Sequence, residues 1–421
     1  MKKYVVIKLF LLPFIIIILV HLTKPSDARI YIDITSPVSE KLPIAIQEFS
    51  GKYGQEISDI ITQDLNYTGI FNCIDKNAHI EKPNQNFNPK NWTPLGVETV
   101  VKGSVTDAGD LIVKISLYDV TENKEVLRKE YKGSLNLLRP ISHTISNDIY
   151  HFLTGQNGIF RTRIIFITDE QGAKSLNIMD WDGHRINKIG IKSNIIVAPH
   201  WSRDGKKLIY SAEKNRLWNI YLLDFKELIE KKIYSSKGVN IPGDFLSDNE
   251  ITLSSSKDGS SDIYIMNLQN SNLTKITSSH GIDISPTVSP DSRYIAFVSD
   301  RGGSPQIYVM RRDGTDIRRI TFEGNYNTSP IWSPKGDKIA FVGRRGTNQI
   351  FTINPDGTEL TQLTHTGNNE EPSFSPDGMF IAFTSDRDGV KSIYLMRANG
   401  EGKKRITPLN ISAHSPRWSP N

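Results

Sequence analysis

The sequence predicts an α/β N-terminal domain at residues 29–155, followed by an all-β six-bladed β-propeller at residues 160–421. Three observations predict this fold: a repeat of 42 to 44 residues in the second region, incomplete repeats at both ends of that region, and a first region that mixes helix and strand patterns without the repeat. A period of roughly 40 to 45 residues with four short strands in each unit is typical of a β-propeller.

The repeat is clearest between Pro286 and Thr321. Its proline is followed by an apolar triad at residues 295–297, an alternating run at residues 307–310 and an Asp-Gly pair at residues 313–314. Short alternating runs separated by Asp-Gly and Gly-Gly indicate strands joined by hairpins, so each unit is expected to form a four-stranded antiparallel sheet. The opening prolines are Pro199, Pro242, Pro286, Pro330, Pro372 and Pro416.

One repeat departs from this pattern. Two residues after the proline, most units carry a bulky apolar residue, such as Trp201 and Trp332. The unit that begins at Pro242 has Asp244 in that place, and Phe245 follows one position later.

The ends of the repeated region indicate how the ring closes. After Pro416 the chain has room for only one strand, whereas residues 164–183 supply a triad, an alternating run and an Asp-Gly turn without a first strand. Pairing of the C-terminal strand with the strands of this N-terminal blade would complete a sixth blade and remove two exposed sheet edges. We therefore predict a closed six-bladed ring.

Residues 1–28 are typical of an export signal. Two lysines at positions 2 and 3 precede an apolar run from Leu9 to Val20, and Ser26-Asp27-Ala28 offers small residues for cleavage. We expect a signal peptide cleaved after Ala28 and a periplasmic mature protein; the alternative is an uncleaved anchor, although a spanning helix needs about 20 apolar residues. Cys73 is the only cysteine, which excludes an internal disulfide.

Charge and motifs exclude several classes of function. The net charge of +5 falls to +2 without residues 1–28, which contain four lysines and one aspartate, so nucleic-acid binding is not expected. The sequence has no His-Glu-x-x-His, Cys-x-x-Cys or Gly-x-Ser-x-Gly motif and no phosphate-binding loop. Most of the repeated aspartates stand at turn positions, where they cap the turn. We expect no cofactor, no metal and no small-molecule substrate.

Binding surfaces remain as the candidate site. The loops that precede the repeat prolines should surround one mouth of the central channel, because each leads into the innermost strand of a blade. Loops held by a rigid ring are common recognition sites. The candidate residues at this mouth are Ala198, Asn240, Ile241, Ile284, Ser285, Thr328, Ser329, Glu370, Glu371, His414 and Ser415.

The repeat sequence from Ser329 to Phe341, Ser-Pro-x-Trp-Ser-Pro-x-Gly-x-x-Ile-Ala-Phe, resembles the WD40-like repeats of periplasmic propellers. With the export signal, the α/β domain, the terminal Pro-Arg-Trp-Ser-Pro and the Arg-Ile-Tyr-Ile-Asp at the expected mature start, the whole mature chain resembles the TolB family. This family is the soluble periplasmic component of the Tol–Pal system in Gram-negative bacteria.

The resemblance implies a non-enzymatic adaptor, expected to be a monomer. It would bind the peptidoglycan-associated lipoprotein Pal at the channel mouth and TolA through the mature N-terminal segment, serving outer-membrane integrity and constriction during cell division. Other outer-membrane lipoproteins are further candidate partners. The N-terminal site would comprise Arg29, Ile30, Tyr31, Ile32, Asp33 and Ile34, although this segment also has the pattern of an ordinary edge strand.

Two enzymatic alternatives stay open. The chain could be the propeller domain of a prolyl-oligopeptidase-like hydrolase that lacks its catalytic domain, since residues 29–155 are too short for a hydrolase domain and lack a serine elbow. A sugar- or metal-dependent propeller enzyme would need acids or histidines facing the channel, for which Glu370, Glu371 and His414 are the candidates.

Overall fold

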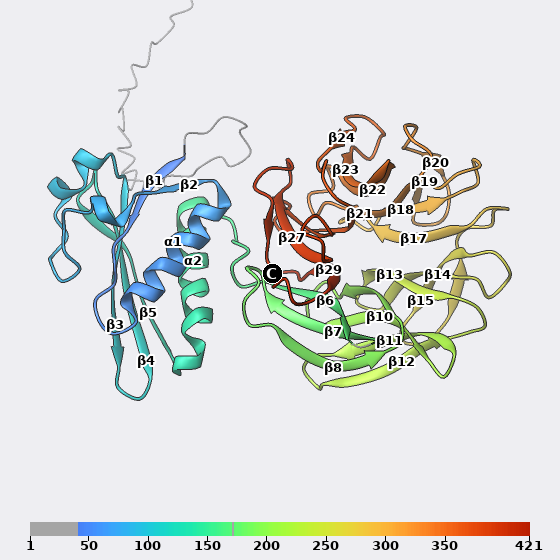
Figure 1. The fold of residues 1–421 in the computed structure, drawn as a ribbon, viewed down its shortest axis with the longest axis horizontal. Coiled ribbons are helices and arrows are strands. Elements are labelled where there is room, and N and C mark those ends of the chain that lie inside the picture. Colours follow the sequence, from blue (N-terminus) through green and yellow to red (C-terminus); the bar gives the residue numbers. More distant parts are fainter. Residues whose placement is uncertain (1–40, 171) are drawn as a thin grey trace, which may run out of the picture.

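The computed structural model describes residues 41–170 and 172–421, which form a five-stranded sheet with two α-helices followed by six four-stranded sheets. The predicted fold class, an α/β domain followed by a six-bladed propeller, is confirmed (Figure 1). The predicted signal peptide with its cleavage site at Ala28, and the predicted segment Arg29 to Ile34, lie outside the described residues.

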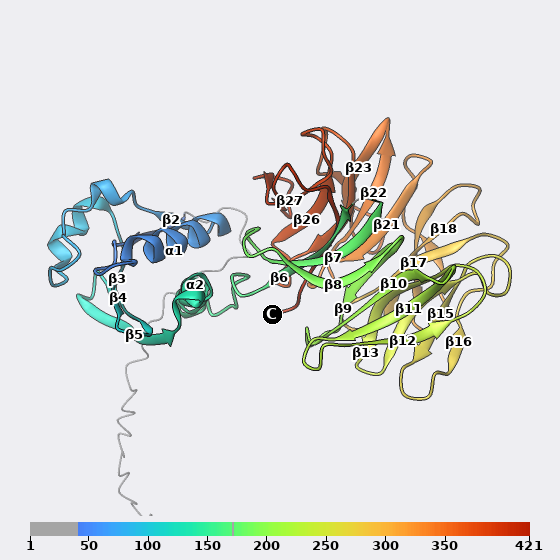
Figure 2. The ribbon, with the colours of Figure 1, turned by 60° about the horizontal axis from the view of Figure 1, so that its bottom comes forward.

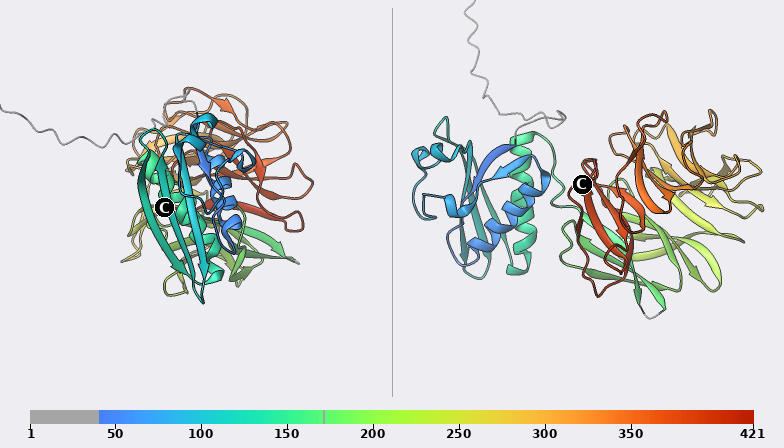
Figure 3. Two further views of the ribbon diagram at one scale, coloured as in Figure 1. Left: turned by 90° about the vertical axis from the view of Figure 1, so that its left-hand side faces the viewer. Right: turned by 45° about the horizontal axis from the view of Figure 1, so that its top comes forward.

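The first region is built on a mixed sheet with the strand order β2-β1-β3-β4-β5, in which β1 runs parallel to β2 and β3. Its elements are β1 (Leu42–Ile46), α1 (Gly54–Thr68), β2 (Phe71–Cys73), β3 (Thr99–Asp107), β4 (Leu111–Asp119), β5 (Lys124–Gly133) and α2 (Leu138–Thr154). Short 3-10 turns occupy Lys76–Ala78, Pro89–Asn91, Thr93–Leu95 and Leu135–Leu137. Figures 1 and 3 show both helices on the face of the sheet that is turned toward the propeller.

The two helices form where the sequence predicts them. α1 buries Ile57, Ile61 and Leu65, and α2 buries Ile145 and Ile149, each at helical spacing. Both helices end at glycines with left-handed backbone, Gly69 at φ 76° and Gly155 at φ 72°, which glycine adopts without the steric cost of a side chain. Among the described residues, no helix is both long and apolar enough to cross a membrane.

The propeller consists of six antiparallel sheets, whose arrangement as a ring is clearest in Figure 2. The first sheet contains β6 (Arg163–Glu170), β7 (Ala173–Asp180) and β8 (Asn187–Ser193), and the second contains β9 (Ile196–Trp201), β10 (Lys207–Lys214), β11 (Leu217–Asp224) and β12 (Ile229–Ser235). The third contains β13 (Asn240–Ser247), β14 (Glu250–Ser255), β15 (Asp262–Asn267) and β16 (Leu273–Lys275). The fourth contains β17 (Asp283–Val288), β18 (Tyr294–Ser299), β19 (Gln306–Arg311) and β20 (Arg318–Arg319). The fifth contains β21 (Asn327–Trp332), β22 (Ile339–Arg345), β23 (Thr347–Ile353) and β24 (Thr361–Gln362). The sixth contains β25 (Asn369–Phe374), β26 (Phe380–Ser385), β27 (Ser392–Arg397) and β28 (Lys404–Arg405).

The ring closes as predicted. The last strand, β29 (Ala413–Trp418), pairs antiparallel with β6 and completes the first sheet, in the order β29-β6-β7-β8. Trp418 pairs with Ile164, and its indole Nε1 donates a 2.7 Å hydrogen bond to Thr162 Oγ1. Strands from the two ends of the propeller region therefore share one sheet, which leaves no open end to the ring.

Candidate functional site: the channel mouth

One mouth of the channel is formed where the innermost strands begin. These strands are β9, β13, β17, β21, β25 and β29, and each lies at one edge of its sheet and comes first in the chain order of the repeat. The loops that lead into them come from the preceding blade, so neighbouring blades both contribute to the mouth. We call the candidate residues in these loops and strand starts the mouth residues: Ala198, Asn240, Ile241, Ile284, Ser285, Thr328, Ser329, Glu370, Glu371, His414 and Ser415.

Five innermost strands share an unusual backbone at the residue before the repeat proline. Ala198, Ser285, Ser329, Glu371 and Ser415 have φ between 50° and 54°, in the left-handed region. The pairing register shifts at the same place, for example between Thr328 and Ile331. A β-bulge accommodates a proline because an unpaired position needs no N–H donor. Non-glycine residues in left-handed backbone are costly and concentrate at functional sites.

The innermost strand of the irregular repeat is built differently. In β13 the register shifts between Pro242 and Phe245, and Ile241 keeps ordinary backbone. The extra residue lets Phe245 fill the core, while the Asp244 carboxylate accepts hydrogen bonds from Thr287 Oγ1 (2.6 Å) and the Val288 backbone N–H (2.9 Å). Its other oxygen lies 2.7 Å from His200 Nδ1. Asp244 therefore joins three consecutive innermost strands.

The first residue of most innermost strands is a buried amide or carboxylate. Asn240 is fully buried, and its side chain donates to the Trp218 carbonyl (2.9 Å) and accepts from Ser255 Oγ (2.6 Å). Asp283 pairs with Arg301 at 2.9 Å, and Asn369 accepts a 2.9 Å hydrogen bond from Arg387. Asn240 thus supports the mouth from inside and does not present its side chain at the surface.

The structure brings together four of the mouth residues between the first and sixth blades. Glu371 accepts hydrogen bonds from the Ser415 backbone N–H (2.8 Å) and Oγ (2.6 Å). Glu370 accepts from Asn348 Nδ2 (2.8 Å) and lies 3.2 Å from Lys391 Nζ. His414 Nδ1 lies 2.9 Å from Ser415 Oγ. We call these residues, with Lys391, Lys174 and Asp169, the charged mouth cluster.

Lys174, Lys391 and Asp169 are functional candidates that the sequence analysis missed. They lie at or beside the connections between second and third strands, and Lys174 Nζ is 3.3 Å from His414 Nε2. Burial and the two lysines lower the pKa of His414 below its ordinary value of 6.5, against the opposing effect of nearby acids. His414 is therefore neutral near pH 7, and the cluster presents two ammonium groups among three carboxylates.

The other mouth residues occupy the remaining positions of the rim. Ala198, Ile241, Ser285, Thr328 and Ser329 are partly exposed, and the side chain of Ile284 packs against the core between the fourth and fifth blades. Three consecutive inter-blade loops also expose an apolar side chain that the sequence analysis did not single out: Val239, Ile282 and Phe322. Phe322 is 71% exposed, which is unusual for a phenylalanine.

The opposite end of the channel holds a cavity of about 370 Å³. It is lined by His200, Asp244 and Arg417 among others, and Arg417 donates to the carbonyls of Pro199 and Pro372, both at 3.1 Å. These groups are already occupied in joining innermost strands to one another. The cavity therefore belongs to the inner framework of the ring, in contrast to the mouth.

Proteins of known family match both domains of this chain. A family model described as the TolB amino-terminal domain matches residues 30–126, and one described as the TolB beta propeller domain matches residues 150–421. The chain is 34% identical to a protein TolB homolog of Chlorobium luteolum, over 90% of this chain and 88% of that protein. It is 30% identical to the Tol-Pal system protein TolB of Bordetella pertussis, over 94% of this chain and 92% of that protein.

A solved structure agrees with these sequence relatives. The crystal structure of TolB from Acinetobacter baumannii superposes with a TM-score of 0.81 at 29% identity, covering 91% of this chain and 98% of that one. Both domains are thus matched in the same order, and the chain belongs to the TolB family of the Tol-Pal system.

Proposed function

We propose that this chain is a non-enzymatic periplasmic adaptor of the Tol–Pal system. In this proposal the channel mouth binds Pal, the segment from Arg29 to Ile34 binds TolA, and the two contacts together serve outer-membrane integrity and constriction during cell division. The proposal treats residues 1–28 as the export signal, with cleavage after Ala28. Membership of the TolB family supports an adaptor in this system.

The observation that best supports the mouth as the binding site is the way its residues are arranged. Five strained backbone positions and the charged mouth cluster occur together on one face of a rigid ring, contributed by loops of neighbouring blades. Fixed loops of this kind need little ordering when a partner binds, which favours affinity. Paired acids and bases at the rim would supply specificity and steer the approach of the partner.

The same geometry argues for a binding role for the acids at the mouth. Glu371 uses both carboxylate oxygens to hold Ser415, and Glu370 is paired with Lys391. Acids engaged in this way are poorly placed for proton transfer, and they suit a recognition surface.

Calorimetric titration with the periplasmic domain of Pal from the same organism tests the proposal. The variant Glu370→Ala with Thr328→Trp removes one rim charge and adds bulk at the mouth, while Glu371 is left in place because it supports the backbone of Ser415. We expect one-to-one binding to the chain from residue 29 to residue 421 and at least about tenfold weaker binding to the variant, roughly 1.4 kcal/mol.

A matched control places the same kinds of change at the opposite end of the channel. Arg203 and Asp204 are exposed there, and the double variant Arg203→Trp with Asp204→Ala should bind Pal within about twofold of wild type. An equal loss of Pal affinity in both double variants would contradict the proposed site. So would the absence of Pal binding to the wild-type chain.

Removal of residues 29–34 should abolish binding of TolA.

A further inference from the structure

The two domains meet across a continuous apolar core. Tyr67 of α1 stacks on Phe380 of the sixth blade, with ring centroids 5.0 Å apart, and lies 5.1 Å from Trp181 of the first blade. Phe160, in the connection between the domains, also contacts Trp181, at 5.8 Å. The helices therefore dock on blades one and six, on the side of the ring opposite the mouth.

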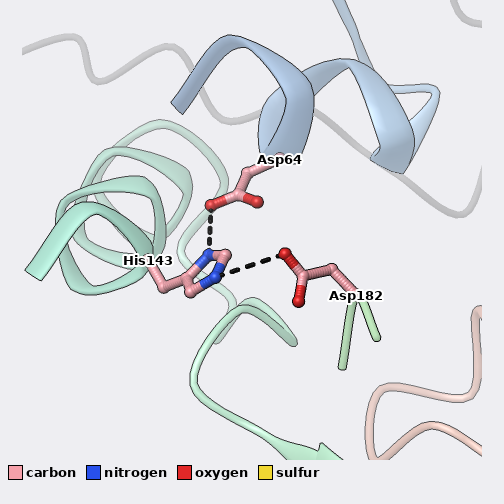
Figure 4. A group of neighbouring side chains, drawn as sticks. All are labelled: Asp64, His143 and Asp182. Atoms are coloured by element: carbon pink, nitrogen blue, oxygen red, sulfur yellow. Dashed lines mark hydrogen bonds and ion pairs between the residues drawn. The ribbon is translucent and has the colours of Figure 1, made fainter. Parts of the chain in front are cut away.

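Polar side chains from three elements converge inside this interface (Figure 4). His143 of α2 lies between Asp64 of α1 and Asp182 of the β7–β8 turn, with its Nδ1 2.8 Å from Asp64 Oδ2 and its Nε2 3.4 Å from Asp182 Oδ2. The side chains of His143 and Asp64 are 3% and 2% exposed, and that of Asp182 is 11% exposed. Arg139 of α2 also pairs with Asp182. The Arg139, Asp64 and Asp182 side chains are the charged groups that face His143.

The turn that carries Asp182 is held firmly in place. Gly183 has φ 90°, and a Cβ there would lie 2.1 Å from the Ile406 carbonyl oxygen of the neighbouring blade. Only glycine fits this position, so the turn packs directly on the sixth blade. The Asp182 carboxylate is thereby fixed at the interface as part of the rigid propeller.

The position of His143 between two carboxylates favours the protonated form of its imidazole ring. A neutral imidazole has one N–H and one lone pair, so one of its nitrogens would turn a lone pair toward a buried carboxylate. An imidazolium donates from Nδ1 to Asp64 and places its positive charge beside the Asp182 carboxylate, 3.4 Å from Nε2. With Arg139 included, two cations then face two anions, which is the arrangement that buried charges require.

We propose that the imidazolium of His143 is a proton-held latch that fixes the α/β domain on the propeller through Asp64 and Asp182. Loss of its proton would leave two buried carboxylates facing a neutral ring and weaken the docking of the domains. Arg139 would keep a charged contact to Asp182, so deprotonation loosens the interface and does not by itself abolish it.

The direction of the pH dependence follows from the same contacts. Burial acts to lower the pKa of His143, but the hydrogen bonds and charges of Asp182 and Asp64 outweigh it and raise the pKa to about 9. A raised pKa contributes stability that is complete below the ordinary value of 6.5 and is lost as the pH rises through about 9. Burial also acts to raise the pKa of Asp182, but His143 and Arg139 outweigh it and lower the pKa below the ordinary 3.8, so its contribution is lost only in acid.

The geometry distinguishes this latch from a metal site. Asp64, His143 and Asp182 could in principle each offer a ligand atom. A metal ion, however, would be bound by one ring nitrogen with both carboxylates on that side of the ring, whereas here the carboxylates lie at opposite nitrogens and Arg139 already neutralises Asp182.

Two measurements on the full mature chain test the latch. In nitrogen-15 NMR of the imidazole groups, His143, assigned by its absence in His143→Gln, should have both nitrogens protonated at pH 7.5. In small-angle X-ray scattering, Asp182→Asn and His143→Gln should have larger radii of gyration than wild type at pH 7.5. Wild type should expand as the pH rises through about 9, and His143→Gln should lack that step.

The matched control is Asp313→Asn, which changes the equivalent Asp-Gly turn on a blade away from the interface. It should scatter like wild type. If His143→Gln fails to fold by circular dichroism, Asp182→Asn still tests the latch, because Asp182 lies in the turn between β7 and β8 and not in a helix or strand of either core. A neutral His143 at pH 7.5, or identical scattering by all variants from pH 7 to 10, would overturn the proposal. So would a stoichiometric zinc ion whose chelation separates the domains.

Discussion

At the scale of single residues, Asp244 explains why one repeat departs from the pattern of the others. Its carboxylate joins β9 through His200 and β17 through Thr287 and the Val288 backbone. Burial acts to raise the pKa of Asp244, but these partners outweigh it and lower the pKa from 3.8 to about 2. The irregular repeat therefore adds a charged tie between innermost strands, while Phe245 keeps the apolar packing.

Asp244→Asn removes the charge from this tie. Because hydrogen bonds to an ionised group contribute about 1.5–3 kcal/mol, we expect the free energy of unfolding to fall by about 2 kcal/mol at pH 7 in chemical denaturation. The lowered pKa contributes stability that is present above about pH 4 and is lost as the pH falls toward 2, so the difference from wild type should shrink there. The exposed Asp248→Asn is the control, and an equal effect of the two substitutions would refute the tie.

At the scale of elements, β29 closes the ring by pairing with β6. Its Trp418 is 6% exposed, donates from the indole to Thr162, and donates from its backbone N–H to Ser373 Oγ. The strand thereby connects the sixth blade, the first blade and the connection from the α/β domain.

Trp418→Ala should weaken this closure strongly. Truncation of a buried tryptophan costs about 3–5 kcal/mol, so the midpoint of guanidinium unfolding should fall well below that of wild type. Trp418→Phe keeps most of the apolar volume and loses the bond to Thr162, so it should cost less. Unfolding of Trp418→Ala at the wild-type midpoint would mean that the ring does not depend on this strand.

Periodicity explains which elements could be predicted. The regular repeat indicated the blades and their closure, and the spacing of isoleucines indicated both helices. The short 3-10 turns between Lys76 and Leu95 have no period to recognise. At the mouth, the repeat indicated which loops meet, but it could not reveal that Asn240 points inward. Nor could it show that Lys174 and Lys391 reach the site from other strand connections, since each of these contacts reaches across the second strand of its own blade.

At the scale of the whole molecule, the mouth and the α/β domain occupy opposite sides of the ring. β7 begins near the charged mouth cluster with Lys174 and leads into the turn that carries Asp182 at the interface with the helices. A partner can therefore approach the mouth without meeting the α/β domain. In the proposed arrangement, the blades that carry the charged mouth cluster also carry the interface at which His143 holds the two domains together.

Hydrogen–deuterium exchange of the mature chain with and without the periplasmic domain of Pal tests the central claim most directly, because it reports every loop of the ring at once. We predict slower exchange in residues 236–241, 322–329, 365–371 and 409–415, which are four of the six loops of the mouth, and unchanged exchange in residues 203–206, 290–293 and 334–337 at the other end of the channel. Protection confined to the second set, or no protection of either set at saturating Pal, would contradict it.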